Sequence, residues 1–225
     1  MSRLASNRKI CTYEDFTVFE GDFRSICSGW LTDTAVNFGA IYLKNQILGG
    51  KNDQVCLVYA FMCELIKYCD LRRSEAQELL KSVGADKKKW TAFILNDNVD
   101  PTVVSGGCHW TLLMHDPTKN IIWQLDPMSA NVPPHCFQFY QRIKTFFGHE
   151  YKVLECPKMT VNGSCGVYVL EYLHVIFQSI KNDIKDIREM DFSRINDKFA
   201  AERRISYCKI LNSLAEEQKR PPVDV

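Results

Sequence analysis

The chain has 225 residues, of which 46% are apolar and 24% charged, and its net charge at neutral pH is +1. This length and composition are typical of one globular domain that buries its own core. The balanced charge gives no indication of nucleic-acid binding, and no apolar run reaches the roughly 18 residues that a membrane-spanning helix needs. We therefore expect a monomer without nucleic-acid or membrane partners.

The compartment is indicated by the cysteines and by the N-terminus. Ten cysteines are spread along the chain without a CxxC pair or a zinc-ligand spacing. Residues 1–10 lack the apolar centre of a signal peptide. Free thiols persist in reducing compartments, so we expect the cytoplasm or the nucleus, with no metal and no cofactor.

The first half of the chain is predicted to be mainly helical. We expect residues 1–11 to be flexible and residues 12–23 to be extended on the surface of a single domain over residues 12–217. Apolar residues at helical spacing predict a helix over 34–48, with Asp33 as its N-cap. A second apolar segment, 54–68, is also predicted to be a helix. A capping-box pattern at 74–77 predicts the start of a third helix, which Gly84 ends.

The second half begins with a cluster of predicted strands. Four short apolar or alternating runs, separated by turn residues, are the strand candidates: 90–95, 110–115, 121–125 and 151–155. Helices are predicted over 137–147, from Cys165 to about 180 and from about 192 to 214, followed by a flexible tail, 218–225. Helices, then strands, then helices indicate an α+β fold with one sheet between helices.

Cys165 is the leading candidate for a chemical role. It follows the small, polar residues Asn162-Gly163-Ser164 and precedes an apolar run of helical length. A thiol at the first turn of a helix meets unpaired N–H groups and the positive dipole end, which favour the reactive thiolate. Gly163 and Gly166 leave room for another backbone to approach the sulfur.

A thiolate nucleophile needs a base and a group that orients the base. Upstream of Cys165, His109 opens one predicted strand and Asp126 ends the next. The order His109, Asp126, Cys165 is therefore a candidate catalytic triad.

These residues carry a resemblance to a known family. Gly107-Cys108-His109-Trp110, Asp126 and Cys165-Gly166-Val167-Tyr168-Val169 resemble the Ulp/sentrin-specific cysteine proteases, which remove ubiquitin-like modifiers from lysines. Trp30-Leu31-Thr32-Asp33 fits the family's Trp-Leu-Asn-Asp element, with Thr32 in place of Asn. The resemblance covers residues 30–177. Asn96-Asp97-Asn98 followed by Gly106 to Trp110 is most similar to the deneddylase branch.

The resemblance implies a papain-like fold with a central, mostly antiparallel sheet packed between helices. It implies that Cys165 attacks the terminal glycine of a ubiquitin-like modifier, that His109 is the base and that Asp126 orients it. Trp30 and Trp110 would wall a tunnel for a diglycine tail, with Gly163 and Asp33 as further substrate contacts. The expected partners are the neddylation modifier, or SUMO as second choice, and their conjugates, processed by maturation or deconjugation.

The sequence also departs from the family at the oxyanion site. Met159 occupies the position six residues before the nucleophile, where the family has a Gln that binds the oxyanion. Asn162 or Thr160 would have to supply the second donor beside the N–H of Cys165. Losing one such donor typically costs about 10²–10³ in rate, so a slow protease or a rearranged oxyanion hole is expected.

Three alternatives to an active protease remain open. Met159 motivates a catalytically weak module that still binds the modifier. An acyltransferase is the second alternative, because a related clan uses the same His–acid–Cys order. A plain structural scaffold is the third, although a scaffold does not need a spaced triad.

Overall fold

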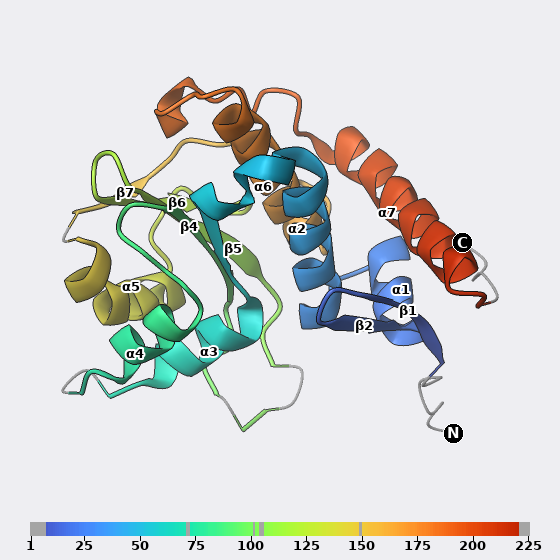
Figure 1. Ribbon diagram of the computed structural model, residues 1–225, viewed down its shortest axis with the longest axis horizontal. Helices are drawn as coiled ribbons and strands as arrows, with labels where there is room; N and C mark the ends of the chain where they lie inside the picture. The colour runs from blue at the N-terminus through green and yellow to red at the C-terminus, as the bar shows by residue number, and fades with distance from the viewer. Residues whose placement is uncertain (1–7, 71–72, 101, 104–105, 149, 221–225) are drawn as a thin grey trace.

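The computed structural model describes residues 8–70, 73–100, 102–103, 106–148 and 150–220. Its centre is a five-stranded sheet in the order β3-β4-β5-β6-β7 (Figure 1). The two central pairs, β4–β5 and β5–β6, are antiparallel, whereas the edge pairs β3–β4 and β6–β7 are parallel. The predicted α+β class is confirmed, but the sheet is mixed rather than mostly antiparallel. Its strands are β3 (Val55–Val58), β4 (Trp90–Asn96), β5 (Trp110–Asp116), β6 (Ile121–Leu125) and β7 (Glu150–Val153).

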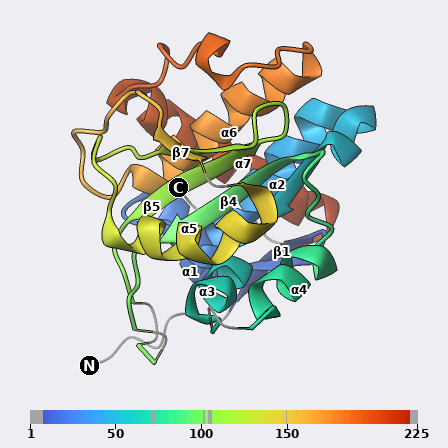
Figure 2. The same cartoon turned by 90° about the vertical axis from the view of Figure 1, so that its left-hand side faces the viewer.

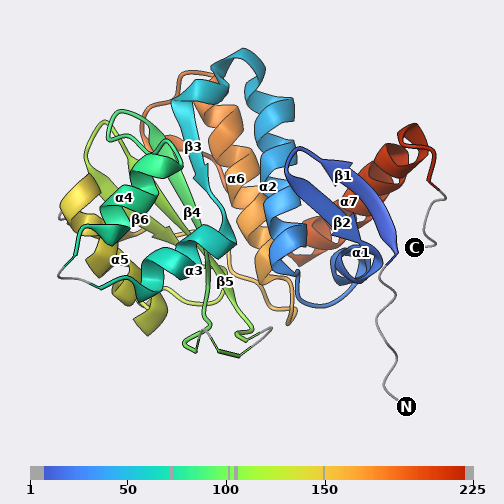
Figure 3. The ribbon, with the colours of Figure 1, turned by 60° about the horizontal axis from the view of Figure 1, so that its bottom comes forward.

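Helices cover both faces of the sheet. The helices α2 (Asp33–Leu48) and α6 (Cys165–Lys181) lie on one face, and the other face carries α3 (Ala60–Tyr68), α4 (Glu75–Ser82) and α5 (Pro134–Phe147) (Figure 3). Figure 2 views the molecule from the side of α5. Successive side chains of a strand point to opposite faces, so Ile94 packs in the core beneath α2 and α6 while Phe93 packs in the core beneath α5. Burial on both faces explains why β4, β5 and β6 are nearly continuous apolar runs.

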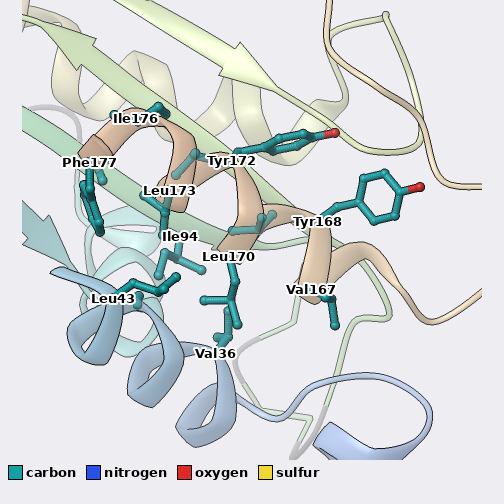
Figure 4. Close-up of a cluster of buried hydrophobic side chains, with 14 of the residues drawn as sticks. Val36, Leu43, Ile94, Val167, Tyr168, Leu170, Tyr172, Leu173, Ile176 and Phe177 are labelled. Atoms are coloured by element: carbon teal, nitrogen blue, oxygen red, sulfur yellow. The ribbon is translucent and has the colours of Figure 1, made fainter. Parts of the chain in front are cut away.

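The helix that begins at Cys165 is buried along most of its length. Leu170, Leu173 and Phe177 of α6 lie beside Val36 and Leu43 of α2 and Ile94 of β4 (Figure 4). The two helices approach closely at Gly39, where an added Cβ would lie 2.6 Å from Cδ1 of Leu170. This packing fixes the position of the Cys165 end of α6.

A further layer lies beside α2 and α6. It contains the hairpin of β1 (Lys9–Tyr13) and β2 (Phe16–Phe19), then α1 (Glu20–Cys27) and the C-terminal α7 (Asp197–Glu217) (Figures 1 and 3). Buried Glu171 of α6 connects this layer to the core, because it accepts hydrogen bonds from Arg203 Nε at 2.7 Å and from Tyr207 Oη at 3.0 Å. Short 3₁₀ helices complete the fold at Gly49–Gln54 and Ile187–Glu189.

Three predictions about the elements are wrong. Residues 55–58 form the edge strand β3 instead of the start of a helix, because they pair with β4 and are buried as a run. Residues 12–23 are not simply extended, since α1 begins at Glu20. Residues 9–11, expected to be flexible, belong to β1, and Ile10 and Cys11 are fully buried. Residues 1–7 and 221–225 of the predicted flexible ends lie outside the described residues.

The helix caps also differ from the prediction. Thr32, and not Asp33, is the N-cap of α2, because its hydroxyl accepts a hydrogen bond from the N–H of Ala35 at 3.2 Å. Ser74 precedes α4 without capping it, since its hydroxyl donates to the carboxylate of Glu78. Within the described residues, no helix combines the length and apolar character needed to cross a bilayer.

Candidate active site

Cys165 is the first residue of α6, as predicted, and its side chain is fully buried. The N–H groups in the first turn of a helix have no partner within the helix. The N–H of Cys165 is one of them, and together with the helix dipole these groups favour a negative charge at this point. The thiol therefore lies where a thiolate, or an oxyanion formed beside it, is electrostatically stabilised.

His109 and Asp126 are brought together by two neighbouring strands. His109 immediately precedes β5, Asp126 immediately follows β6, and the antiparallel register pairs Leu112 with Leu125. Both side chains are buried, and Nε2 of His109 lies 2.8 Å from Oδ1 of Asp126. The structure thus brings these two predicted residues within hydrogen-bonding distance.

The carboxylate of Asp126 is held in its ionised form. Burial raises its pKa, but the hydrogen bond with His109 and the N–H groups of Met128 at 2.8 Å and Ser129 at 3.2 Å outweigh this effect. The net result is a pKa below the ordinary value for aspartate. A buried, ionised carboxylate orients the imidazole and stabilises its protonated form.

The second nitrogen of the His109 ring, Nδ1, is buried and has no hydrogen-bond partner among the described residues, so it is available to a neighbouring group. Cys165 is among the groups that raise the pKa of this ring. Burial of the ring lowers the pKa of His109, but the bonds to Asp126 and Cys165 prevail and raise it to about 9. The arrangement can therefore hold an imidazolium at neutral pH, as a nucleophilic cysteine requires of its partner.

Asp97 fixes the backbone of His109, a role that the sequence analysis did not identify. Its Oδ1 accepts the N–H of Cys108 at 2.7 Å and the N–H of His109 at 2.8 Å, and its own N–H donates to the carbonyl of His109 at 3.1 Å. Gly107 makes this close approach possible: its φ is +79°, and an added Cβ would lie 2.7 Å from the backbone nitrogen of Asn98. The sequence indicated only a turn at 96–98.

A cavity of about 450 Å³ lies between the loop before α2 and the loop before β5. The indole N–H of Trp110 donates to the carbonyl of Leu31 at 2.9 Å and so connects the two walls. Trp110 is buried, whereas Trp30 is 48% exposed. The three residues predicted to bind a substrate tail, Trp30, Asp33 and Trp110, thus line one cavity. Its lining comprises Trp30, Leu31, Thr32, Asp33, Thr34, Asn96, Gly106, Gly107, Cys108 and Trp110.

The two glycines near Cys165 make room for the chain's own loop. Gly163 has a φ of +84°, and an added Cβ would lie 3.2 Å from the carbonyl carbon of Gly29. At Gly166, an added Cβ would lie 2.9 Å from Cγ of Leu31. The sequence predicts Gly163 as a substrate contact, and in the structure the backbone of Gly29 lies against it. Both glycines are required because the loop of residues 28–32 packs against the start of α6 here.

The two candidate oxyanion donors differ in whether they are available to a substrate. Thr160 is unsuitable, contrary to the prediction, because its N–H and its hydroxyl both donate to the carboxylate of Asp197. Met159 is half-buried and packs against the core. Asn162 is exposed, which leaves its side chain as a candidate beside the N–H of Cys165. Among the described residues, no group of three His, Cys, Asp or Glu side chains is arranged to hold a metal ion.

Comparison with known proteins gives a consistent set of similarities. The family described as Ulp1 protease family, C-terminal catalytic domain, matches residues 29–210. Sentrin-specific protease 8 of Mus musculus is 26% identical over 156 residues, covering 67% of this chain and 69% of the relative. Probable sentrin-specific protease 8 of Dictyostelium discoideum is 23% identical over 245 residues, covering 95% of this chain and 100% of the relative.

Solved structures show the same fold. The C-terminal Ulp1 protease domain in complex with Smt3, the yeast orthologue of SUMO, superposes with a TM-score of 0.66 and 16% identity, covering 93% of this chain and 89% of the other. A structure of the SUMO protease Ulp1 with its catalytic cysteine oxidised to a sulfinic acid also gives a TM-score of 0.66, with 17% identity, covering 94% and 91%.

Proposed function

Because the chain belongs to the Ulp1 protease family, and is therefore a cysteine protease that acts on ubiquitin-like modifiers, we propose that Cys165 is its nucleophile. His109 is the base and Asp126 orients the imidazole. One observation carries this proposal: the buried His109 uses Nε2 for Asp126, its Nδ1 has no partner among the described residues, and Cys165 is among the groups that raise its pKa.

The reaction has two steps: His109 gives up one proton in the first and takes one up in the second. The Cys165 thiolate attacks the carbonyl carbon of the modifier's terminal glycine, and the resulting oxyanion is stabilised by the N–H of Cys165. The C–N bond then breaks while the imidazolium of His109 gives its proton to the leaving lysine amine. Neutral His109 next takes a proton from water, whose oxygen attacks the thioester and releases the modifier's carboxylate and the thiolate.

The cavity lined by Trp30 and Trp110 is the proposed tunnel for the diglycine tail. If a substrate carried side chains in place of the two glycines, these would meet the tryptophan rings, so the tunnel selects by exclusion as well as by contact. Asp33 lies in the same lining and is proposed to meet a cationic or N–H group just before the diglycine. This leaves recognition of the modifier's body to the outer surface.

The neddylation modifier is the proposed substrate, with SUMO as the second choice. The resemblance of residues 96–98 and 106–110 to the deneddylase branch supports this assignment, as does the similarity to sentrin-specific protease 8 of mouse. SUMO is retained because the yeast Ulp1 domain, solved in complex with Smt3, has the same fold.

The missing Gln at Met159 favours slow turnover. The identified donors are the N–H of Cys165 and the exposed amide of Asn162, so removing the amide in Asn162→Ala is expected to lower kcat by about tenfold or more. A catalytically weak module that binds the modifier remains the second candidate, and the half-buried Met159 side chain is the observation that favours it.

A panel of modifiers with C-terminal fluorogenic amides tests the proposal. We expect the neddylation modifier to give the highest kcat/KM, SUMO a lower value and ubiquitin the lowest. The same panel with C-terminal electrophiles separates an enzyme from a binding module, since only an enzyme forms an adduct that Cys165→Ala abolishes. Tight binding without an adduct would favour the module, and acetylation of Cys165 by acetyl-coenzyme A would favour an acyltransferase.

A further inference from the structure

One side chain of α7 joins the two loops that flank the proposed tunnel. Arg204 Nη1 donates to the carbonyls of Ser25 at 3.0 Å and Ile26 at 2.8 Å, at the end of α1. Its Nη2 donates to the carbonyl of Gly29 at 2.6 Å and to that of Gly163 at 2.7 Å. The four acceptors are backbone atoms from two segments that are far apart in the sequence.

The partners of Arg204 distinguish it from an ordinary surface cation. Among the described residues no carboxylate forms a salt bridge with it. Its side chain is half-buried, and burial lowers its pKa, while Cys165 is the largest of the opposing electrostatic influences. A buried cation is costly unless it is hydrogen-bonded, and here backbone carbonyls supply the bonds. The planar fork of an arginine suits such a set of diverging acceptors.

The two loops meet at a pair of glycines, which have no side chains. Gly29 and Gly163 have φ values of +90° and +84°, and their backbones are close enough that an added Cβ on Gly163 would lie 3.2 Å from Gly29. Trp30, which lines the cavity, follows Gly29 directly, and Cys165 lies two residues after Gly163. A change in the separation of these glycines would therefore move the tunnel wall relative to the sulfur.

We propose that Arg204 is a positioning residue. It clamps the loop that carries Trp30 (residues 28–32) onto the loop that precedes Cys165 (residues 162–164) and so fixes the diglycine tunnel relative to the nucleophile. The proposal rests on the proposed function of Cys165 and the tunnel. Each of the four hydrogen bonds of Arg204 goes to a backbone carbonyl, and none of them goes to Cys165. It acts through the backbones of Gly29 and Gly163, and misplacing reacting groups by about 1 Å can cost about 10² in rate.

Arg203 provides a matched control. It is the preceding residue on α7 and also fastens this helix to the body, but its Nε binds the carboxylate of Glu171 at 2.7 Å and does not reach either loop. If Arg204 merely held α7 in place, loss of Arg203 would have the same effect on turnover. The comparison thus separates positioning of the tunnel from docking of the helix.

The kinetic test compares Arg204→Met, Arg204→Lys and Arg203→Met on the fluorogenic modifier that the unmodified enzyme cleaves fastest. We expect Arg204→Met to lower kcat by about 10–100-fold, with a smaller change in KM. Arg204→Lys keeps the charge but loses the fork, so it should recover part of the rate. Arg203→Met should stay within about threefold of the unmodified enzyme below its unfolding temperature. Equal losses in Arg204→Met and Arg203→Met, or no loss in Arg204→Met, would overturn the proposal.

Hydrogen exchange supplies a readout that does not depend on the substrate. In Arg204→Met, backbone amides of residues 28–31 and 162–166 should exchange faster, whereas Arg203→Met should leave these two segments unchanged. Unchanged exchange in Arg204→Met would refute the clamp. If no modifier were cleaved by the unmodified enzyme, the proposed function would fail, and the exchange data would still decide whether Arg204 joins the loops.

Discussion

Replacing Asp126 by Asn tests the electrostatics of the site most sharply. Asn has nearly the shape of Asp and can still accept a hydrogen bond from His109, but it lacks the charge that favours the imidazolium. The pKa of His109 is raised from 6.5 to about 9, in spite of burial, with the hydrogen bond to Asp126 as the largest favourable cause. This difference corresponds to roughly 3 kcal/mol of preference for the imidazolium.

The sign of the pH effect follows directly. In the unmodified enzyme His109 keeps its proton until the pH rises through about 9, so the proton for the leaving amine is lost only above that value. Without the carboxylate, burial continues to lower the pKa of His109, and the alkaline limb of kcat/KM should move towards pH 6.5. At slightly alkaline pH, losing the part of this preference that comes from Asp126 predicts a drop of about tenfold or more in kcat/KM.

The assay measures kcat/KM for a fluorogenic modifier from about pH 5 to about pH 10, together with the rate at which iodoacetamide alkylates Cys165. Asp191→Asn is the matched control, since Asp191 is exposed and binds the N–H of Ser193 in a distant turn. An alkaline limb that stays near pH 9 in Asp126→Asn would refute the assignment of Asp126 as the group that charges the imidazole.

Three further substitutions probe the frame of the site. Asp97→Ala should lower the free energy of unfolding by about 1–3 kcal/mol, measured with urea, because the buried N–H of His109 loses its acceptor. Glu171→Gln should cost about 1–3 kcal/mol by the same measurement, because the half-buried charge of Arg203 loses its carboxylate partner. Gly163→Ala should lower the free energy of unfolding by about 1–2 kcal/mol and reduce turnover, since φ at this position is +84°.

Each of these expectations can fail in its own way. Unfolding of Asp97→Ala at an unchanged urea midpoint would mean that water replaces the lost acceptor. Glu171→Gln with unchanged stability would show that the buried ion pair adds nothing over a neutral hydrogen bond. Gly163→Ala with full activity would show that the loop of residues 28–32 does not need its close contact with Gly163.

The parts of the fold that sequence patterns predicted are those with one dominant local signal. The helix after Cys165 and the strand at 121–125 are apolar runs bounded by turn residues, and both occur as expected. The run at 55–58 was assigned to a helix because a short, continuously apolar segment has no periodicity of its own. Its strand character comes from pairing with β4, a contact that is distant in the sequence.

The candidate site divides along the same line. His109, Asp126 and Cys165 could be proposed from the sequence because each stands at the end of an element and belongs to a residue type that is common in catalysis. The roles of Asp97 and Arg204 cannot be predicted from the sequence, because their partners are backbone atoms, which every residue type provides. The prediction for Thr160 is wrong because nothing in the sequence indicates that its hydroxyl binds Asp197 at the start of α7.

The most direct measurement locates the bond that the enzyme forms with a modifier. Cys108 makes this a sharp test, because it is an exposed thiol in the lining of the same cavity, whereas Cys165 is buried. Peptide mapping by mass spectrometry of the adduct with a neddylation modifier that carries a C-terminal electrophile should place the modifier on Cys165, with no adduct in Cys165→Ser and an unchanged yield in Cys108→Ser. An adduct on Cys108, or one that persists in Cys165→Ser, would contradict the account.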